Sequence, residues 1–229
     1  MFTSDFKPVK TRRTVQDQVY DQMREALVSG AFEAGQAFTI PALAEKFMTS
    51  HMPIREALRR LAAENALRIS PAGTATVPSL DIDELRKIRQ TRLILEPATA
   101  ETAFDLITAD DRTALGTLIE THRATGESGD IVAMLAANRA FHFRIYAASG
   151  NEVLVSQIEN LWLRSGPYVR YLSDKMSELL QTSYKTGFTK YHEQMVAALD
   201  DGDKAGFKAA MADDITATHD LLLEFLSQD

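Results

Sequence analysis

Two histidines, an asparagine and an aspartate in the second half of the chain have the types and spacing of metal ligands. Asn138 and His142 stand four residues apart, so one helical face would carry both, and His192 and Asp214 fall on or beside two later apolar stripes. Buried polar side chains must be paired or bound to something. Two imidazoles, a carboxylate and an amide oxygen inside a helical bundle suit a divalent metal such as zinc, nickel or manganese. Neighbouring backbone or hydroxyl groups could instead satisfy each histidine, and this alternative stays open.

The turn at residues 200–203 indicates how these side chains could meet. It joins two predicted helices into an antiparallel hairpin, with His192 eight residues before the turn and Asp214 eleven after it. At a rise of about 1.5 Å per residue they lie roughly 12 and 16 Å from the turn, which is nearly the same level. His219 would lie about 24 Å away and off the apolar stripe, so Asp214 is favoured as the partner of His192.

A second set of polar side chains, near residue 55, has the pattern of a nucleic-acid contact. His51, Arg55 and Arg59 follow one exposed face of a helix that is predicted to begin after Ser50. Arg55 and Arg59 are four apart and therefore point the same way, as a helix that lies in a DNA major groove requires. A solvated basic face on an ordinary helix would carry the same charges, so the charges alone leave both interpretations open.

Three short helices and a β-hairpin are predicted to position these cations. Apolar residues at three- and four-residue steps predict the helices, and short β-prone runs around a Pro-Ala-Gly turn predict the hairpin. The first helix ends at Ser29-Gly30, the second covers about 41–47, and the third runs from Ser50 to Asn65. The hairpin pairs residues 67–70 with residues 74–77. These are the parts of a winged helix-turn-helix, which we assign to a DNA-binding domain at residues 1–78.

Residues 79–229 are predicted to form an antiparallel all-α bundle of six or so helices, which makes the chain mainly α. Asp81 offers a cap to the first helix, and Pro97 is expected to kink or split it. The other helices are predicted over about 109–124, 130–149, 151–165, 175–200 and 203–227, with no strand signal. The interior of such a bundle can hold a ligand site.

Composition and charge exclude several function classes. The 229 residues include no Cys, which removes disulfides, thiolate metal sites and cysteine nucleophiles, and they contain no Gly-rich phosphate loop. No run approaches the roughly 18 apolar residues of a membrane helix, and the first thirty residues include Asp5, Asp17, Asp21 and Glu25, so they do not read as a signal peptide. A cytoplasmic protein without a membrane partner is therefore expected. The formal net charge of −7 is uneven: residues 1–78 hold 10 basic and 8 acidic side chains, and the rest hold 15 and 24. This asymmetry indicates a nucleic-acid-facing segment attached to an acidic domain.

The segment from Ser50 to Leu61, Ser-His-Met-Pro-Ile-Arg-Glu-Ala-Leu-Arg-Arg-Leu, resembles the Ser-Arg-x-Pro-Val-Arg-Glu-Ala-Leu signature of GntR-family bacterial transcription regulators. The resemblance covers about residues 12–78. It implies contacts with operator DNA by Ser50, His51, Met52, Arg55, Arg59, Gly73 and Thr74, with Arg12 and Arg13 as candidates in an N-terminal arm. Three cations found in the family are missing, because Pro41, His51 and Ala72 stand at their positions, so weak non-specific DNA binding is expected.

The second half resembles the FCD ligand-binding domain of FadR-type members of that family, over about residues 80–222. The matching segments are Arg92 to Glu96, Asn138-Arg139-Ala140-Phe141-His142, Ser149-Gly150-Asn151, and His192 before the Gly202-Asp203 turn. Many members bind a metal through residues that correspond to Asn138, His142 and His192, and Asp214 stands at the remaining histidine position. The resemblance also implies that Arg92 pairs with an effector carboxylate through its planar fork, with Asn151 as a second effector contact.

The sequence therefore predicts a DNA-binding transcription regulator, a repressor, that binds a pseudo-palindromic operator in double-stranded DNA as a homodimer. A small carboxylate effector, with or without a divalent metal, would change the relative placement of the two DNA-binding domains of the dimer. Two other regulators stay open: one that senses acyl-CoA or another large ligand without metal, and one whose bundle only dimerises. A helical metal-dependent hydrolase or lyase is disfavoured, because such an enzyme would not use the basic helix and hairpin. We therefore expect that the protein is not an enzyme.

Overall fold

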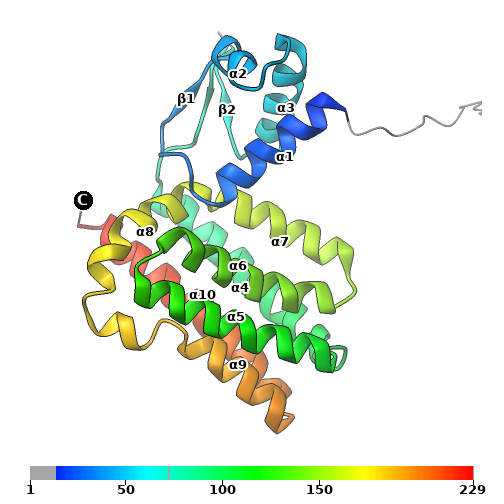
Figure 1. Ribbon diagram of the computed structural model, residues 1–229, viewed down its shortest axis with the longest axis vertical. Helices are drawn as coiled ribbons and strands as arrows, with labels where there is room; N and C mark the ends of the chain where they lie inside the picture. Colours follow the sequence, from blue (N-terminus) through cyan, green and yellow to red (C-terminus); the bar gives the residue numbers. More distant parts are fainter. Residues whose placement is uncertain (1–13, 72, 229) are drawn as a thin grey trace, which may run out of the picture.

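The first part of the chain folds as three helices and a small antiparallel sheet. The computed structural model describes residues 14–71 and 73–228, so Arg12, Arg13 and Ala72 lie outside the described residues. The elements are α1 (Val15–Val28), β1 (Ala37–Phe38), α2 (Ile40–Lys46), α3 (His51–Ala63), β2 (Arg68–Ile69) and β3 (Ala75–Thr76). β3 lies between β1 and β2 and pairs antiparallel with both (Figure 1). The predicted hairpin is confirmed, and β1 is a strand that the sequence analysis did not predict.

Local signals in the sequence set the ends of these helices. Thr14 opens a reciprocal capping box at the start of α1, and Thr39 caps α2, where Pro41 fits the first turn. Ser50 occupies the N-cap position of α3, although its side chain makes no capping hydrogen bond. Asn65 has a left-handed backbone with φ 60° just after α3, the conformation expected of the residue that ends this helix.

The second part of the chain is an all-α bundle. Its elements are α4 (Ile82–Phe104), α5 (Ala109–Ser128), α6 (Ile131–Ala148), α7 (Glu152–Arg164), α8 (Gly166–Leu179), the 3-10 helix η1 (Ser183–Thr186), α9 (Lys190–Asp201) and α10 (Lys204–Leu226). The most extensive packing joins α4 to α10, α5 to α6, and α9 to α10 (Figure 1). The mainly α fold class is confirmed. None of the described helices is long and apolar enough to cross a membrane.

The single helix predicted over 175–200 is wrong. α8 already ends at Leu179, and α9 begins only at Lys190. Between them the Thr182 hydroxyl donates to the Leu179 carbonyl and accepts from the backbone N–H of Tyr184. Such local side-chain bonds offer the backbone an alternative to the helix, and here they help to end it.

Pro97 does not split α4, which runs without interruption from Ile82 to Phe104. A proline inside a helix removes one hydrogen bond and costs about 3 kcal/mol. Pro97 is buried, and α4 packs along α10 more extensively than any other pair of elements does. Tertiary packing of this kind, rather than local propensity, is what stabilises most protein helices.

Two glycines bring α1 against the bundle at very short range. A Cβ on Gly166, the first residue of α8, would lie 2.2 Å from the carbonyl oxygen of Leu27. A Cβ on Gly30, whose φ is 72°, would lie 2.8 Å from the backbone nitrogen of Arg170. Leu163 of α7 also belongs to the apolar core of the first part. The winged helix-turn-helix therefore docks directly on α7 and α8, and only glycine allows so close an approach.

Candidate metal centre and DNA-binding face

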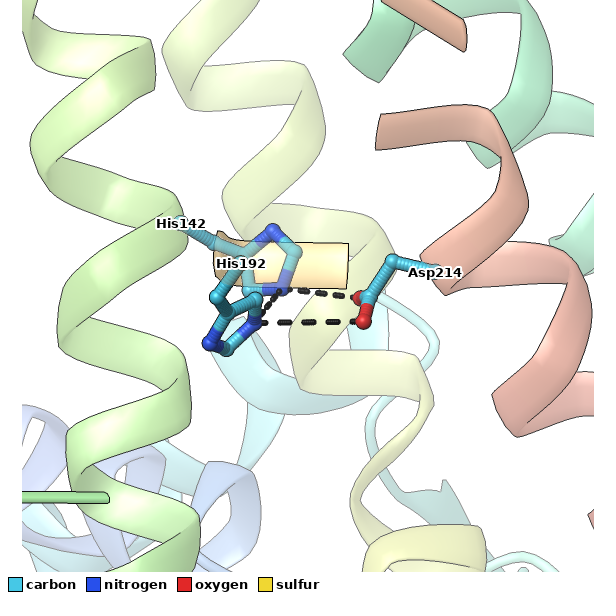
Figure 2. Close-up of side chains that lie close together, drawn as sticks. All are labelled: His142, His192 and Asp214. Carbon is cyan, nitrogen blue, oxygen red and sulfur yellow. Dashed lines mark hydrogen bonds and ion pairs between the residues drawn. The ribbon is translucent and has the colours of Figure 1, made fainter. Parts of the chain in front are cut away.

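His142, His192 and Asp214 converge inside the bundle from α6, α9 and α10 (Figure 2). One ligand atom of each lies within 4.8 Å of the others. His142 Nε2 lies 3.1 Å from Asp214 Oδ2 and 3.3 Å from His192 Nε2, and His192 Nε2 lies 3.9 Å from Asp214 Oδ1. The α9–α10 hairpin turns at Gly202, so His192 and Asp214 reach the same level of the bundle.

The electrostatics of His192 and Asp214 favour the forms in which these two residues bind a metal. Burial lowers the pKa of His192 to about 3, although the charge of Asp214 opposes this shift. Burial alone would raise the pKa of Asp214, but the hydrogen bond from His142 and its charge outweigh burial and lower the value to about 2. Neutral imidazole and ionised carboxylate are ligands for divalent metals. With nitrogen and oxygen donors only, the set fits zinc, nickel or manganese.

A chain of buried hydrogen bonds orients the His142 ring. The His142 Nδ1 atom lies 3.1 Å from the Tyr146 hydroxyl, which donates to Glu96 Oε2 at 2.5 Å. Glu96 also accepts from Trp162 Nε1 at 3.2 Å. Outer partners of this kind fix the orientation of a ligating imidazole, so this chain holds the Nε2 atom of His142 toward Asp214.

Arg92, expected to hold an effector carboxylate, is already paired inside this chain. Its Nε and Nη2 atoms donate to the two oxygens of Glu96 at 2.6 and 3.0 Å, and the guanidinium lies 4.6 Å from the Trp162 ring. Arg92 is 8% exposed and Glu96 is fully buried. An effector carboxylate at Arg92 would therefore have to displace an internal one. Its predicted role as an effector contact is not tested by this arrangement and stays a prediction.

The two asparagines singled out in the sequence have different surroundings. Asn138, one turn before His142, is half-buried and lines a cavity of about 200 Å³ between α1 and α6. Asn151 is exposed, and its Oδ1 atom accepts from the backbone N–H of Leu154 at the start of α7. Their roles as a metal ligand and an effector contact stay predictions.

His122, on α5, is a polar group of the site that the sequence analysis missed. It is 3% exposed, and its ring centroid lies 5.2 Å from that of His192. Burial lowers its pKa to about 4. Among the described residues, neither His122 Nδ1 nor His192 Nδ1 has a hydrogen-bond partner. The sequence carries a signal for its burial alone, because His122 follows Leu115 and Ile119 at helical spacing on the apolar face of α5.

The recognition face combines α3 with the hairpin. His51, Met52, Arg55 and Arg59 are exposed on α3, whereas Ile54 and Leu58 point into the core. Arg55 and Arg59 line one groove together with Gly73 and Thr74 of the hairpin turn. Arg59 pairs with Glu56 at 3.0 Å but remains largely exposed. Both guanidinium groups are therefore available to an anion that approaches this face.

Comparison with known proteins gives the family. Residues 15–77 match the family model of bacterial regulatory proteins of the gntR family, and residues 87–217 match that of the FCD domain. The chain is a gntR-family regulator with an FCD domain. The resemblance inferred from the sequence motifs is thereby confirmed.

This gntR-family regulator is similar to proteins of the same kind along most of its length. It is 33% identical over 196 residues to the HTH-type transcriptional regulator McbR of Escherichia coli (strain K12), covering 86% of this chain and 87% of that protein. The solved structure of E. coli McbR/YncC is 30% identical, with a TM-score of 0.85 over 93% of this chain and 99% of that one. The gluconate operon transcriptional repressor of Bacillus subtilis (strain 168) is 26% identical over 187 residues, or 80% of this chain and 75% of that protein.

These matches establish the general activity of this gntR-family regulator. It is a DNA-binding transcription regulator with an effector-binding C-terminal domain. FCD domains commonly bind a metal, and the cluster of His142, His192 and Asp214 is a possible site for one.

Proposed function

We propose that this regulator is a cytoplasmic repressor, not an enzyme, that binds a pseudo-palindromic operator in double-stranded DNA as a homodimer. Residues 1–78 form the DNA-binding domain, and residues 79–229 form the effector-binding and dimerisation domain. The observation that carries this proposal is the exposed face of α3, where Arg55 and Arg59 line one groove with the turn of the hairpin. Two copies are needed because two half-sites about one helical turn apart require two recognition helices.

The roles of the DNA-binding residues follow from their places on this face. Ser50, His51 and Met52 stand at the N-terminal end of α3, which is the end that reaches base edges in helix-turn-helix proteins. Arg55 and Arg59, one turn further along, supply positive charge to backbone phosphates. Gly73 and Thr74 at the tip of the hairpin approach the neighbouring backbone, which the left-handed Gly73 (φ 84°) permits. Arg12 and Arg13, outside the described residues, would add phosphate contacts from the N-terminal arm.

The C-terminal domain is proposed to hold a divalent metal (zinc, nickel or manganese) through His142, His192 and Asp214, with Asn138 as the fourth candidate. A metal bound there would supply a Lewis-acidic position for an oxygen of a small organic acid. The effector would release the operator if it bound more tightly to a dimer whose two DNA-binding domains do not match the half-site spacing.

Selection from a random double-stranded DNA library tests the DNA-binding part. The purified protein should enrich a two-fold symmetric site and occupy it with two chains per duplex, as measured by native mass spectrometry. Enrichment of no sequence, or one chain on an asymmetric site, would contradict the proposal.

Elemental analysis tests the metal part. Protein purified without chelator, or incubated with each of the three metals and desalted, should retain one divalent ion per chain, whereas the His142→Ala and His192→Ala variants should retain much less. Wild-type protein that stays metal-free after all three incubations contradicts the metal site and leaves the DNA-binding proposal standing.

A further inference from the structure

An effector carboxylate needs a cation whose present partner can leave, and Arg139 meets this condition better than Arg92. Glu96, the partner of Arg92, is fully buried and is held by two further hydrogen bonds. Arg139, on α6, donates to both oxygens of Glu25 at 2.7 and 3.0 Å. The side chain of Glu25 is 62% exposed, so it can swing into solvent without losing a buried environment.

Arg139 stands beside a cavity that lies between the two parts of the chain. The cavity has a volume of about 200 Å³. Its walls include Val28 from α1, Leu135 from α6, Trp162 from α7 and Val169 from α8. The polar groups at the cavity are few, and Arg139 is the cation among them. A largely apolar hollow, partly open to solvent and with one cation in its wall, fits a ligand that has an aliphatic body and one carboxylate.

The volume indicates how much of a ligand the cavity can cover, because its open side, where Val132 is 74% exposed, leads into solvent. A water molecule takes about 30 Å³ of liquid, so the cavity holds roughly seven non-hydrogen atoms. A monocarboxylate with about five carbons has this size. Most of an acyl-CoA molecule would lie outside this cavity.

We propose that this cavity binds a short aliphatic monocarboxylate, whose carboxylate takes the place of Glu25 on Arg139. The inference rests on the proposed control of this regulator by an organic acid and names the site and class of that acid. Binding would break the ion pair that ties α1 to α6, at an interface where Gly30 and Gly166 already bring the backbones into direct contact. The ligand would therefore act on the placement of the DNA-binding domain itself.

The cavity also shares walls with the metal centre. Trp162 lines the cavity, and its ring centroid lies 5.5 Å from that of His142. Asn138 lines the cavity as well and precedes His142 by one turn. Occupation of the cavity is thus positioned to affect the orientation of His142, and metal binding is positioned to affect the cavity.

Titration calorimetry with a series of straight-chain acids tests the proposal. Pentanoate should bind the wild-type protein more tightly than acetate, which cannot fill the cavity, and acids longer than about seven non-hydrogen atoms, such as decanoate, should gain little more because the rest of the tail would lie in solvent. Arg139→Gln should weaken pentanoate binding about tenfold or more, because a charge-assisted bidentate contact is lost. Glu25→Gln should strengthen it several-fold, because the competing carboxylate is gone. Ala136→Phe, which projects a ring from the cavity wall, should abolish binding.

Arg144→Gln is the matched control, since Arg144 lies on the same helix and pairs with Asp111 instead. It should bind pentanoate as the wild type does. Equal affinity of wild type, Arg139→Gln and Glu25→Gln would overturn the proposed cavity site, even if the acid still controls operator binding from elsewhere. If the wild-type protein binds none of the acids, the proposed site is overturned as well. Selection of an operator by the same sample would show that the regulator still binds DNA, so the failure would concern the acid site alone.

Discussion

His142 and Asp214 face each other across the bundle, with 3.1 Å between Nε2 of the imidazole and Oδ2 of the carboxylate (Figure 2). The resemblance to the family places a histidine at position 214, so this pair replaces an imidazole–imidazole arrangement. The carboxylate brings a negative charge to a position where the resemblance implies a neutral imidazole. In the proposed metal site this difference would favour manganese, because carboxylate oxygen suits manganese better than imidazole nitrogen does.

Exchange at position 214 should therefore change which metal binds. Asp214→His should shift the preference of the site toward zinc and nickel over manganese, since it adds a third imidazole. Asp214→Ala should lower the affinity for all three metals. Competition titrations with a chromogenic chelator measure both effects, and an unchanged order of affinities in Asp214→His would show that Asp214 is not a ligand.

Loss of the Tyr146 hydroxyl should weaken both the fold and the metal site. Tyr146→Phe leaves Glu96 and His142 Nδ1 each short of one buried hydrogen bond, which should destabilise the protein by about 1–3 kcal/mol. Metal affinity should fall by about 10-fold or more, because the outer partner of a ligand is removed. Urea unfolding and metal titration measure the two effects. Tyr191→Phe, a half-buried tyrosine on α9, is the matched control and should change neither.

Gly166→Ala should disturb the docking of the DNA-binding domain. The new Cβ would meet the carbonyl oxygen of Leu27 at 2.2 Å, and backbone on both sides leaves little room to adjust. Overpacking of this kind destabilises by about 1–3 kcal/mol. Gly116→Ala is the control, because Gly116 lies inside α5 with open space around it, and alanine there should stabilise the helix by about 0.5–1 kcal/mol. Thermal unfolding measures the stability of both variants. Equal stability of Gly166→Ala and Gly116→Ala would contradict this interface.

His219 should make stability fall as the pH falls below neutral. Burial and the nearby charge of Arg92 lower its pKa to about 4, although its hydrogen bond to the Ile215 carbonyl opposes the shift. An unfolded histidine has a pKa of about 6.5, so the unfolded chain takes up the proton first, and stability is lost as the pH falls from about 6.5 toward 4. The loss at about pH 5 should be about 2 kcal/mol from this residue.

His219→Gln should remove this part of the pH dependence. The variant can be less stable at all pH values, but the difference between its free energies of unfolding at about pH 7.5 and about pH 5 should shrink by roughly 2 kcal/mol. His51→Gln, which alters an exposed histidine on α3, should keep the wild-type difference. If both variants keep that difference, His219 is not protonated on unfolding in this range.

Helical periodicity explains how much of the site could be predicted. His142, His192 and Asp214 each fall on or beside an apolar stripe, and the short turn at Gly202 fixes the relative level of two of them. His122 was missed because a single histidine on a separate helix has no local pattern that links it to the others. His219 was placed off the stripe, yet it is buried, since α10 is enclosed on more of its surface than its apolar residues alone indicate.

Other features depend on contacts that local patterns do not encode. Glu96 stands one turn after Arg92 in the sequence, but only the packed bundle shows that this carboxylate satisfies the guanidinium from within. The approach of Gly30 and Gly166 joins segments that are far apart in the chain. The break between Leu179 and Lys190 depends on bonds of Thr182 that compete with an otherwise plausible helical pattern.

The salt dependence of operator binding tests the central claim most directly, namely that α3 and the hairpin turn form the DNA-binding face. Fluorescence anisotropy with the selected operator should show affinity falling steeply with salt for the wild type. Arg55→Gln and Arg59→Gln should each weaken binding and reduce the slope of log affinity against log salt by about 1. Arg86→Gln, an exposed arginine on α4, should behave as the wild type does. Operator binding with the wild-type affinity and slope in Arg55→Gln and Arg59→Gln would contradict the account.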